Sequence, residues 1–145
     1  MKITIDTDKS IEEIEVHIKC SQIDESLEEL IANLCLLDST FVGYFEGETH
    51  FVPLNEIIYF EAVDSKIFFY TREKCYESLS KLYKIEEATK NTPFARISKT
   101  TIANLKKMTS IKRAENSRLV ATMASGEKLI VSRQYVSEIK RKLGV

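Results

Sequence analysis

The sequence predicts a mostly β protein with a few short helices, of the α+β class. Between residues 41 and 132, short runs rich in β-branched and aromatic residues recur, and turn residues separate them. Only three stretches show the 3.6-residue apolar period of a helix. At 145 residues, the chain has the length of one domain with a real core, or of a domain with a short appendage.

Residues 2–20 alternate between apolar and polar side chains. Ile14, Val16 and Ile18 fall on every second position, so we expect strands with one buried face. The period then lengthens, and Asp24 precedes the run as a candidate N-cap. The apolar positions of this expected helix are Leu27, Leu30, Ile31, Leu34 and Cys35. Residues 1–44 are thus expected to form a β-β-α segment, too small to be a convincing independent domain.

The elements expected after this segment are mostly strands. They are a hairpin through Gly47, strands at 56–62, 66–71 and 74–79, a helix over 80–91, strands at 108–114, 118–123 and 127–132, and a helix over 133–144. Leu82, Ile85 and Ala88 are expected to form the buried side of the helix over 80–91. Gly144 stands where a left-handed C-terminal residue would end the last helix.

The two parts of the chain carry opposite charge. Residues 1–95 hold nine Lys and Arg against nineteen Asp and Glu, a net of −10, whereas residues 96–145 hold twelve against three, a net of +9. Clustered positive charge concentrates phosphates, so this asymmetry points to a polyanionic partner. The alternative is a solvated basic face that pairs with the acidic half of the same chain.

Several functional classes lack their motifs. The chain has no glycine-rich phosphate loop, no H-E-x-x-H and no nucleophile elbow, so we expect no enzyme, no cofactor and no small-molecule substrate. Cys20, Cys35 and Cys75 form no C-x-x-C pair, and His17 and His50 are not at ligand spacing, so no metal site is expected. Unpaired cysteines, no apolar leader and no long apolar run predict a cytoplasmic protein.

Three ordered segments carry a family resemblance. They are "IIYFEAVDSKIFFYT", "FARISKTTIANLKKM" and "RLVATMASGEKLIVSRQYVSEIKRKLG". In order and spacing they resemble the LytTR DNA-binding domain over roughly residues 45–144. The positions that match the family's motifs are Phe94, Arg96, Lys99, Thr100 and Asn104 in the second segment, and Ser132, Arg133, Tyr135 and Ile139 in the third.

The resemblance implies an elongated stack of small β-sheets that presents loops, rather than a helix, to successive major grooves of DNA. Carried over by position, the base-reaching residues are Ser65 or Lys66, then Lys99, then Arg133. The full set of expected DNA-binding residues is Ser65, Lys66, Arg96, Ser98, Lys99, Thr100, Arg133 and Gln134. Hydroxyl and amide groups suit phosphate oxygens, and an arginine suits guanine. Two alternatives remain: an ion pair of Arg133 with Glu127 or Glu138, and a turn-capping role for Asn104.

The expected organisation is an N-terminal segment, 1–44, followed by a DNA-binding domain, 45–145. The resemblance implies a bacterial transcriptional regulator whose partner is double-stranded DNA. By analogy with small family members, the N-terminal segment is expected to form a homodimer, to dock on a membrane-protein regulator, or both. Alternatively, its helix covers strands of its own chain. The rival function is a protein-interaction adaptor without direct DNA readout.

Overall fold

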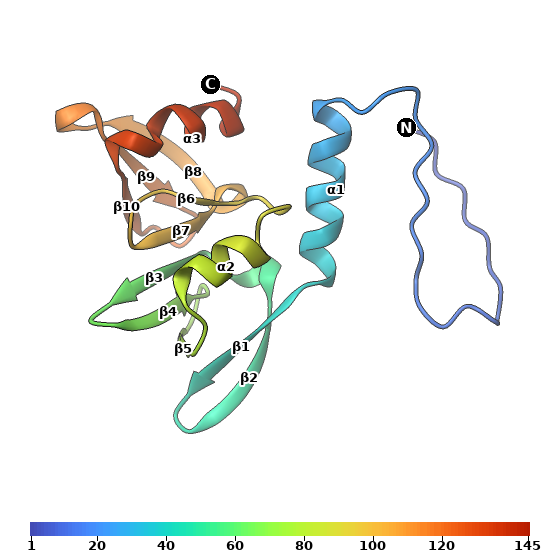
Figure 1. Ribbon diagram of the computed structural model, residues 1–145, viewed down its shortest axis with the longest axis horizontal. Coiled ribbons are helices and arrows are strands. Elements are labelled where there is room, and N and C mark those ends of the chain that lie inside the picture. The colour runs from blue at the N-terminus through green and yellow to red at the C-terminus, as the bar shows by residue number, and fades with distance from the viewer.

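The computed structural model describes residues 1–145 and contains two antiparallel sheets with three helices (Figure 1). The elements are α1 (Glu25–Asp38), β1 (Thr40–Phe45), β2 (Glu48–Pro53), β3 (Tyr59–Val63), β4 (Lys66–Tyr70), β5 (Cys75–Ser78), α2 (Leu82–Ala88), β6 (Phe94–Arg96), β7 (Thr101–Asn104), β8 (Met108–Arg113), β9 (Leu119–Met123), β10 (Lys128–Val131) and α3 (Val136–Leu143). Four 3₁₀ turns interrupt them: η1 (Leu54–Glu56), η2 (Leu105–Lys107), η3 (Glu115–Ser117) and η4 (Arg133–Tyr135). The predicted α+β class is confirmed.

The larger sheet has seven strands in the order β2-β1-β5-β4-β3-β7-β6, and the smaller has three in the order β10-β9-β8. In Figure 1 the smaller sheet lies above the larger one, α3 covers the top and α2 lies in front, between the two sheets. The strands expected between residues 44 and 132 form in the expected order. One expectation for α2 is wrong: Ala88 is exposed, and the buried position is Thr89, whose hydroxyl donates to the Ile85 carbonyl at 2.8 Å.

Two apolar clusters make the core, one for each half of the body. Phe60 and Phe69 lie at the centre of the first, and Ile97 and Ile139 belong to the second. Because side chains of a strand alternate, Phe60 enters one cluster while its neighbour Tyr59 enters the other. β3 therefore joins the two halves into one body.

Tyr59 also ties the large sheet to the β9–β10 hairpin. Its hydroxyl donates to Oε2 of Glu127 at 2.8 Å, and its ring stacks on that of Tyr70 with centroids 4.4 Å apart. Burial, together with the Glu127 carboxylate, raises the pKa of Tyr59 well above its usual value.

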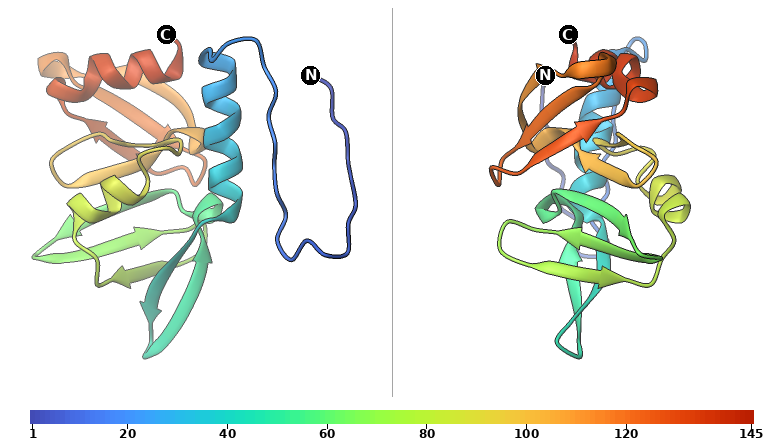
Figure 2. Two further views of the ribbon diagram at one scale, coloured as in Figure 1. Left: turned by 45° about the vertical axis from the view of Figure 1, so that its right-hand side comes forward. Right: turned by 90° about the vertical axis from the view of Figure 1, so that its left-hand side faces the viewer.

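The two strands expected within residues 2–20 are not formed. No helix or strand precedes α1, and every residue from 1 to 26 is exposed. The alternation of apolar and polar residues is present in the sequence, but alternation alone does not form a strand. A strand needs a partner for its backbone hydrogen-bonding groups, and this segment has none in the structure. Figures 1 and 2 show it running beside α1, away from both sheets. We call residues 1–23 the N-terminal arm.

β1 belongs to the body rather than to the N-terminal segment. It pairs with β2 over six positions and contacts β5 at Tyr44, so the expected boundary at residue 44 falls inside a strand. A Cβ atom at Gly43 would lie 2.5 Å from the Phe69 ring, which shows how closely β1 packs on the large sheet. The N-terminal segment is therefore the arm plus α1.

α1 forms where expected, and the Asp24 side chain caps it by accepting from the Leu27 amide at 2.9 Å. Its only buried residue is Leu36, which joins the first core cluster. At about 100° per residue, Leu27 and Leu34 lie on roughly the opposite side of the helix from Leu36. The expected apolar stripe is therefore not the side that packs on the body. No helix in the structure has the length and apolar character needed to cross a membrane.

Candidate nucleic-acid interface

Four connections meet at one end of the two sheets, and strand register places them there. Glu61 pairs with Thr101, so the β3–β4 turn lies beside the loop at 97–100. The Ser132 amide donates to the Ile97 carbonyl at 2.8 Å, which brings η4 against the same loop. Leu119 pairs with Val131, so the loop at 114–118 adjoins η4. We call this end, at the left of Figure 1, the loop edge.

A polar pocket of about 410 Å³ lies at the centre of the loop edge. Two segments far apart in the sequence line it, and none of its residues is hydrophobic. The lining residues are Ser98, Lys99, Thr100, Ser132, Arg133 and Gln134. Two cations and several hydroxyl and amide groups around one hollow form a surface suited to phosphate oxygens and base edges. Five of these six were expected DNA-binding residues; Ser132 had been noted only as a motif position.

Arg133 is exposed and forms no ion pair in the structure. Both alternative partners are engaged elsewhere: Glu138 pairs with Arg141 at 2.6 Å, and Glu127 accepts the Tyr59 hydroxyl. The ion-pair alternative for Arg133 is therefore wrong. η4 holds the backbone of Arg133, since the Tyr135 amide donates to the Ser132 carbonyl at 2.9 Å. An unpaired guanidinium on a fixed backbone is free to meet an external acceptor.

Lys99 is exposed at the tip of its loop, and the buried Ile97 anchors that loop in the core. Arg96 does not point into the pocket. Its Nε donates to Glu86 of α2 at 2.5 Å, and its NH1 donates to the Lys99 carbonyl at 2.7 Å. Only 18% of the Arg96 side chain is exposed. The structure thus uses Arg96 to hold the Lys99 loop against α2.

Ser65 and Lys66 lie at the lower end of the loop edge, outside the pocket. The turn has only two residues, Asp64 and Ser65, between the paired Val63 and Lys66. Both turn residues have positive φ, 48° and 67°, as a tight hairpin turn requires. All four positions from 63 to 66 are exposed, so both expected residues are accessible.

The loop at 114–118 also belongs to this surface, although no expected DNA-binding residue lies in it. Asn116 and Ser117 adopt positive φ, and the exposed Arg118 donates through Nε to the Glu115 carbonyl at 3.1 Å. The dipeptide Asn-Ser between two strands, followed by an arginine, was the available signal. Only the pairing of β9 with β10 shows that this loop lies next to Arg133.

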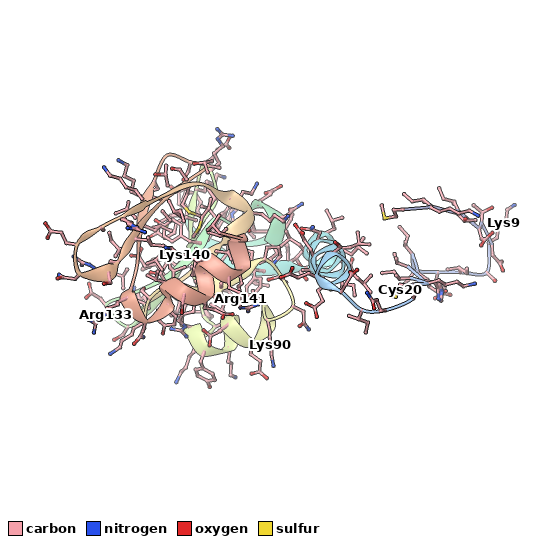
Figure 3. The ribbon with its side chains drawn as sticks, turned by 90° about the horizontal axis from the view of Figure 1, so that it is seen from above. Lys9, Cys20, Lys90, Arg133, Lys140 and Arg141 are labelled. Atoms are coloured by element: carbon pink, nitrogen blue, oxygen red, sulfur yellow. The ribbon has the colours of Figure 1, made fainter.

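Other basic residues lie away from the loop edge. Lys106, at the far end of β7, donates to Glu29 of α1 at 2.9 Å. Figure 3 shows Arg133 at one end of α3, with Lys140 and Arg141 further along the helix towards α1. The charges of Glu25 and Glu28 in α1 help to raise the pKa of Arg141, after the larger effect of Glu138. Part of the basic charge therefore does meet the acidic half of the same chain.

Asn104 is fully buried rather than presented to a ligand. Its Oδ1 accepts from the Lys106 amide at 3.1 Å, and its Nδ2 donates to the Ile57 carbonyl at 3.1 Å. The turn-capping alternative is confirmed.

Comparison with known proteins agrees with this geometry. The family model described as the LytTr DNA-binding domain matches residues 47–144. The chain belongs to the LytTR DNA-binding domain family. That family is defined by a DNA-binding domain and is not an enzyme class, so double-stranded DNA is the partner that it supports. The matched range includes all four connections of the loop edge.

A LytTr DNA-binding domain of a putative methyl-accepting/DNA response regulator from Bacillus cereus has the same fold. It superposes with a TM-score of 0.70 at 24% identity and covers 74% of this chain and 99% of its own. An HTH-type transcriptional regulator of Staphylococcus aureus is 23% identical over 147 residues, covering 100% of this chain and 99% of its own. The sensory transduction protein LytT of Bacillus cereus is 31% identical over 94 residues, 65% of this chain but only 38% of that protein.

Proposed function

We propose that this LytTR protein is a transcriptional regulator that recognises a specific duplex sequence through the connections of its loop edge. The observation that carries the proposal is the pocket in which the unpaired Arg133 stands beside Lys99. A major groove is about 12 Å wide and admits an α-helix or a two-stranded β-ribbon, so the connections at the ends of strands can enter it. The Staphylococcus aureus relative is named as a transcriptional regulator. Its full-length match supports the same role here.

We assign Arg133 the role of base reader. Guanine offers O6 and N7 in the major groove, and a guanidinium can donate to both at once. Lys99 contributes a second positive charge on the opposite wall of the pocket. Ser98, Thr100 and Gln134 supply donors for phosphate oxygens, which set register without reading sequence. Ser65 and Lys66 extend the contact along the duplex, since their turn lies further down the same edge.

The decisive experiment is a selection from random duplex DNA with wild type, Arg133→Ala and a matched control, Arg141→Ala. Arg141 lies on the same helical stretch but is paired with Glu138 away from the loop edge. Wild type should enrich one motif, and Arg133→Ala should lose preference at particular positions, with about 5–150-fold weaker binding to the wild-type motif. The control should keep the motif.

An adaptor without direct DNA readout would behave differently. It would enrich no motif and would show at most weak binding that is independent of sequence. No enrichment by wild type would therefore reject the proposed function. The two functions also differ in salt dependence, because only a DNA reader loses affinity steeply with salt while it keeps a preferred sequence.

We propose further that the protein acts in the cytoplasm, as a homodimer and without a catalytic step. The stripe of α1 supports dimerisation, because Leu27, Leu30 and Leu34 are only half-buried and Ile31 is exposed, so a partner could cover them further. A dimer of a DNA-binding domain with short loops also binds a longer DNA site, and with higher affinity, than one copy does. A membrane-protein regulator, as the family resemblance implies, would contact this same N-terminal segment. Sedimentation equilibrium of the purified chain tests the dimer.

A further inference from the structure

The N-terminal arm has the pattern of a two-stranded ribbon but lacks a partner. A turn at Asp8 reverses the chain: the Ile11 amide donates to the Asp8 carbonyl at 3.2 Å, and the Ser10 amide donates to Asp8 Oδ1 at 2.9 Å. That turn bond is the only backbone–backbone bond within residues 1–23. The backbone groups on both sides of the turn are therefore open to pairing.

A ribbon closed by this turn has one apolar and one polar face. If Ile5 lies opposite Ile14, then Ile3 lies opposite Val16, and all four side chains point to the same face. The other face then carries the polar residues Lys2, Thr4, Asp6, Glu13, Glu15 and His17, with Ile11 beside the turn as its one apolar residue. In the structure Ile3, Ile5 and Ile14 are 74%, 82% and 96% exposed. An isolated ribbon with such a face is marginal in water and needs more strands or a helix to cover it.

The residues from 12 to 20 are complementary to themselves. When two copies pair antiparallel about Val16, Ile14 meets Ile18 and Val16 meets Val16 on the apolar face, and Glu12 meets Cys20 at the two ends of that face. On the polar face, Glu13 meets Lys19 and Glu15 meets His17. Opposite charges thus face each other at both ends of the pairing, which a two-fold axis repeats. The arm contains no proline or glycine that would block this edge.

The outward stripe of α1 supplies a cover for such a sheet. Leu27, Ile31 and Leu34 lie on the side away from the body, and none of them is buried. Figures 1 and 3 show the arm beyond α1, on the side of the molecule opposite the loop edge. The stripe lies opposite Leu36 on the helix and therefore faces that side. Together they make a surface of about 20–30 residues, the size that one partner contributes to a standard protein interface.

We propose that residues 12–20 of two copies of this chain pair antiparallel about Val16, giving a four-stranded sheet whose apolar face the two α1 helices cover. The proposal rests on the proposed function only in that it gives the DNA reader its second copy. The occupant is a second copy rather than a lipid surface, because the arm carries six acidic and three basic residues through Asp24 and would be repelled by anionic headgroups. The loop edge stays free in this dimer.

Sedimentation velocity of the full chain without DNA tests the interface independently of any DNA site. Wild type should be a dimer at micromolar concentration. Ile14→Glu should weaken dimerisation at least about 100-fold, because both copies bury a charge in the apolar face. Thr4→Glu is the matched control: it adds the same side chain on the polar face and should change the dimer dissociation constant by less than about threefold.

A charge exchange tests the register. Glu13→Lys and Lys19→Glu each place like charges opposite one another and should weaken the dimer, whereas the double variant should restore it to within about threefold of wild type. A monomeric wild type at about 100 µM would overturn the proposal, as would a dimer insensitive to Ile14→Glu. A monomer whose amides at 14–18 exchange slowly would place the ribbon on its own α1 and reject the second copy. Loss of the dimer with the DNA motif retained would leave the proposed function intact.

Discussion

The loop edge and the N-terminal arm place polar and apolar side chains in opposite ways. At the loop edge, exposed polar residues stand on a buried frame: Ile97 is fully buried two positions before Lys99, and Val131 two positions before Arg133. In the arm, isoleucine and valine side chains are exposed and no core lies beneath them. A fixed frame is what a surface needs to read a rigid duplex, because contacts must be held in place before binding.

The N-terminal arm shows the opposite case, an apolar face with no core to pack on. Alternation of apolar residues gives a strand one apolar face. That face stabilises an ordered strand only when a second apolar surface packs on it and excludes water. The loop edge can therefore be complete within one chain, whereas the arm is incomplete until a partner covers it. Three pairs of substitutions test this contrast, in order of expected effect.

The largest effect is expected at the frame of the loop edge. Ile97→Ala removes a fully buried side chain and should lower the free energy of unfolding by about 2–5 kcal/mol. Leu37→Ala, in the N-terminal segment, removes a side chain that is 69% exposed and should change it by less than about 1 kcal/mol. Urea unfolding of both variants measures the difference. Equal costs would show that the N-terminal segment is as firmly packed as the loop edge.

An intermediate effect is expected at Arg96, which holds the Lys99 loop without facing the pocket. Arg96→Gln loses the bonds to Glu86 and to the Lys99 carbonyl and should weaken binding to the selected motif by about 10-fold. Glu86→Gln removes only the partner in α2 and should act in the same direction but less strongly. Competition binding with duplexes altered at single positions measures both. Full binding by Arg96→Gln would show that the loop keeps its place without this anchor.

The smallest effect separates two lysines of one segment. Lys99→Ala removes a charge at the loop edge and should reduce the slope of log affinity against log salt by about 0.9. Lys106→Ala removes a charge already paired with Glu29 beside α1 and should leave that slope unchanged. DNA-binding titrations of both variants at four salt concentrations measure the two slopes. An equal reduction in both variants would mean that DNA reaches the side of the molecule next to α1.

Local patterns predicted most elements but not their neighbours. The pattern of apolar residues located the three helices and the strands β1 to β5 and β8 to β10, because period 2 and period 3.6 reflect backbone geometry alone. It did not indicate the short strands β6 and β7, which flank the loop at 97–100. Which side of α1 faces the body did not follow from the pattern. The pattern predicts that the apolar stripe is the buried side, whereas Leu36 on the opposite side of the helix contacts the core.

The candidate site shows the same division. Arg133 and Lys99 were found from motif spacing, but their joint lining of one pocket depends on a bond between Ser132 and Ile97, 35 positions apart in the chain. For a similar reason, Arg96 lies outside the pocket although it was an expected DNA-binding residue, and Arg118 lies at the loop edge although it was not. Arg96 matches the motif yet binds Glu86, and Arg118, outside the motif, lies beside η4 because Leu119 pairs with Val131.

By itself, the sequence determined most of the secondary structure of the body, the family, and the division into acidic and basic parts, because each depends on residue type and short-range spacing. Only the tertiary structure decided which basic residues share the loop edge, which ones meet the acidic helix, and that the arm lies uncovered. Those features depend on strand register and on side-chain packing between distant segments, and neither is encoded in any local stretch of the chain.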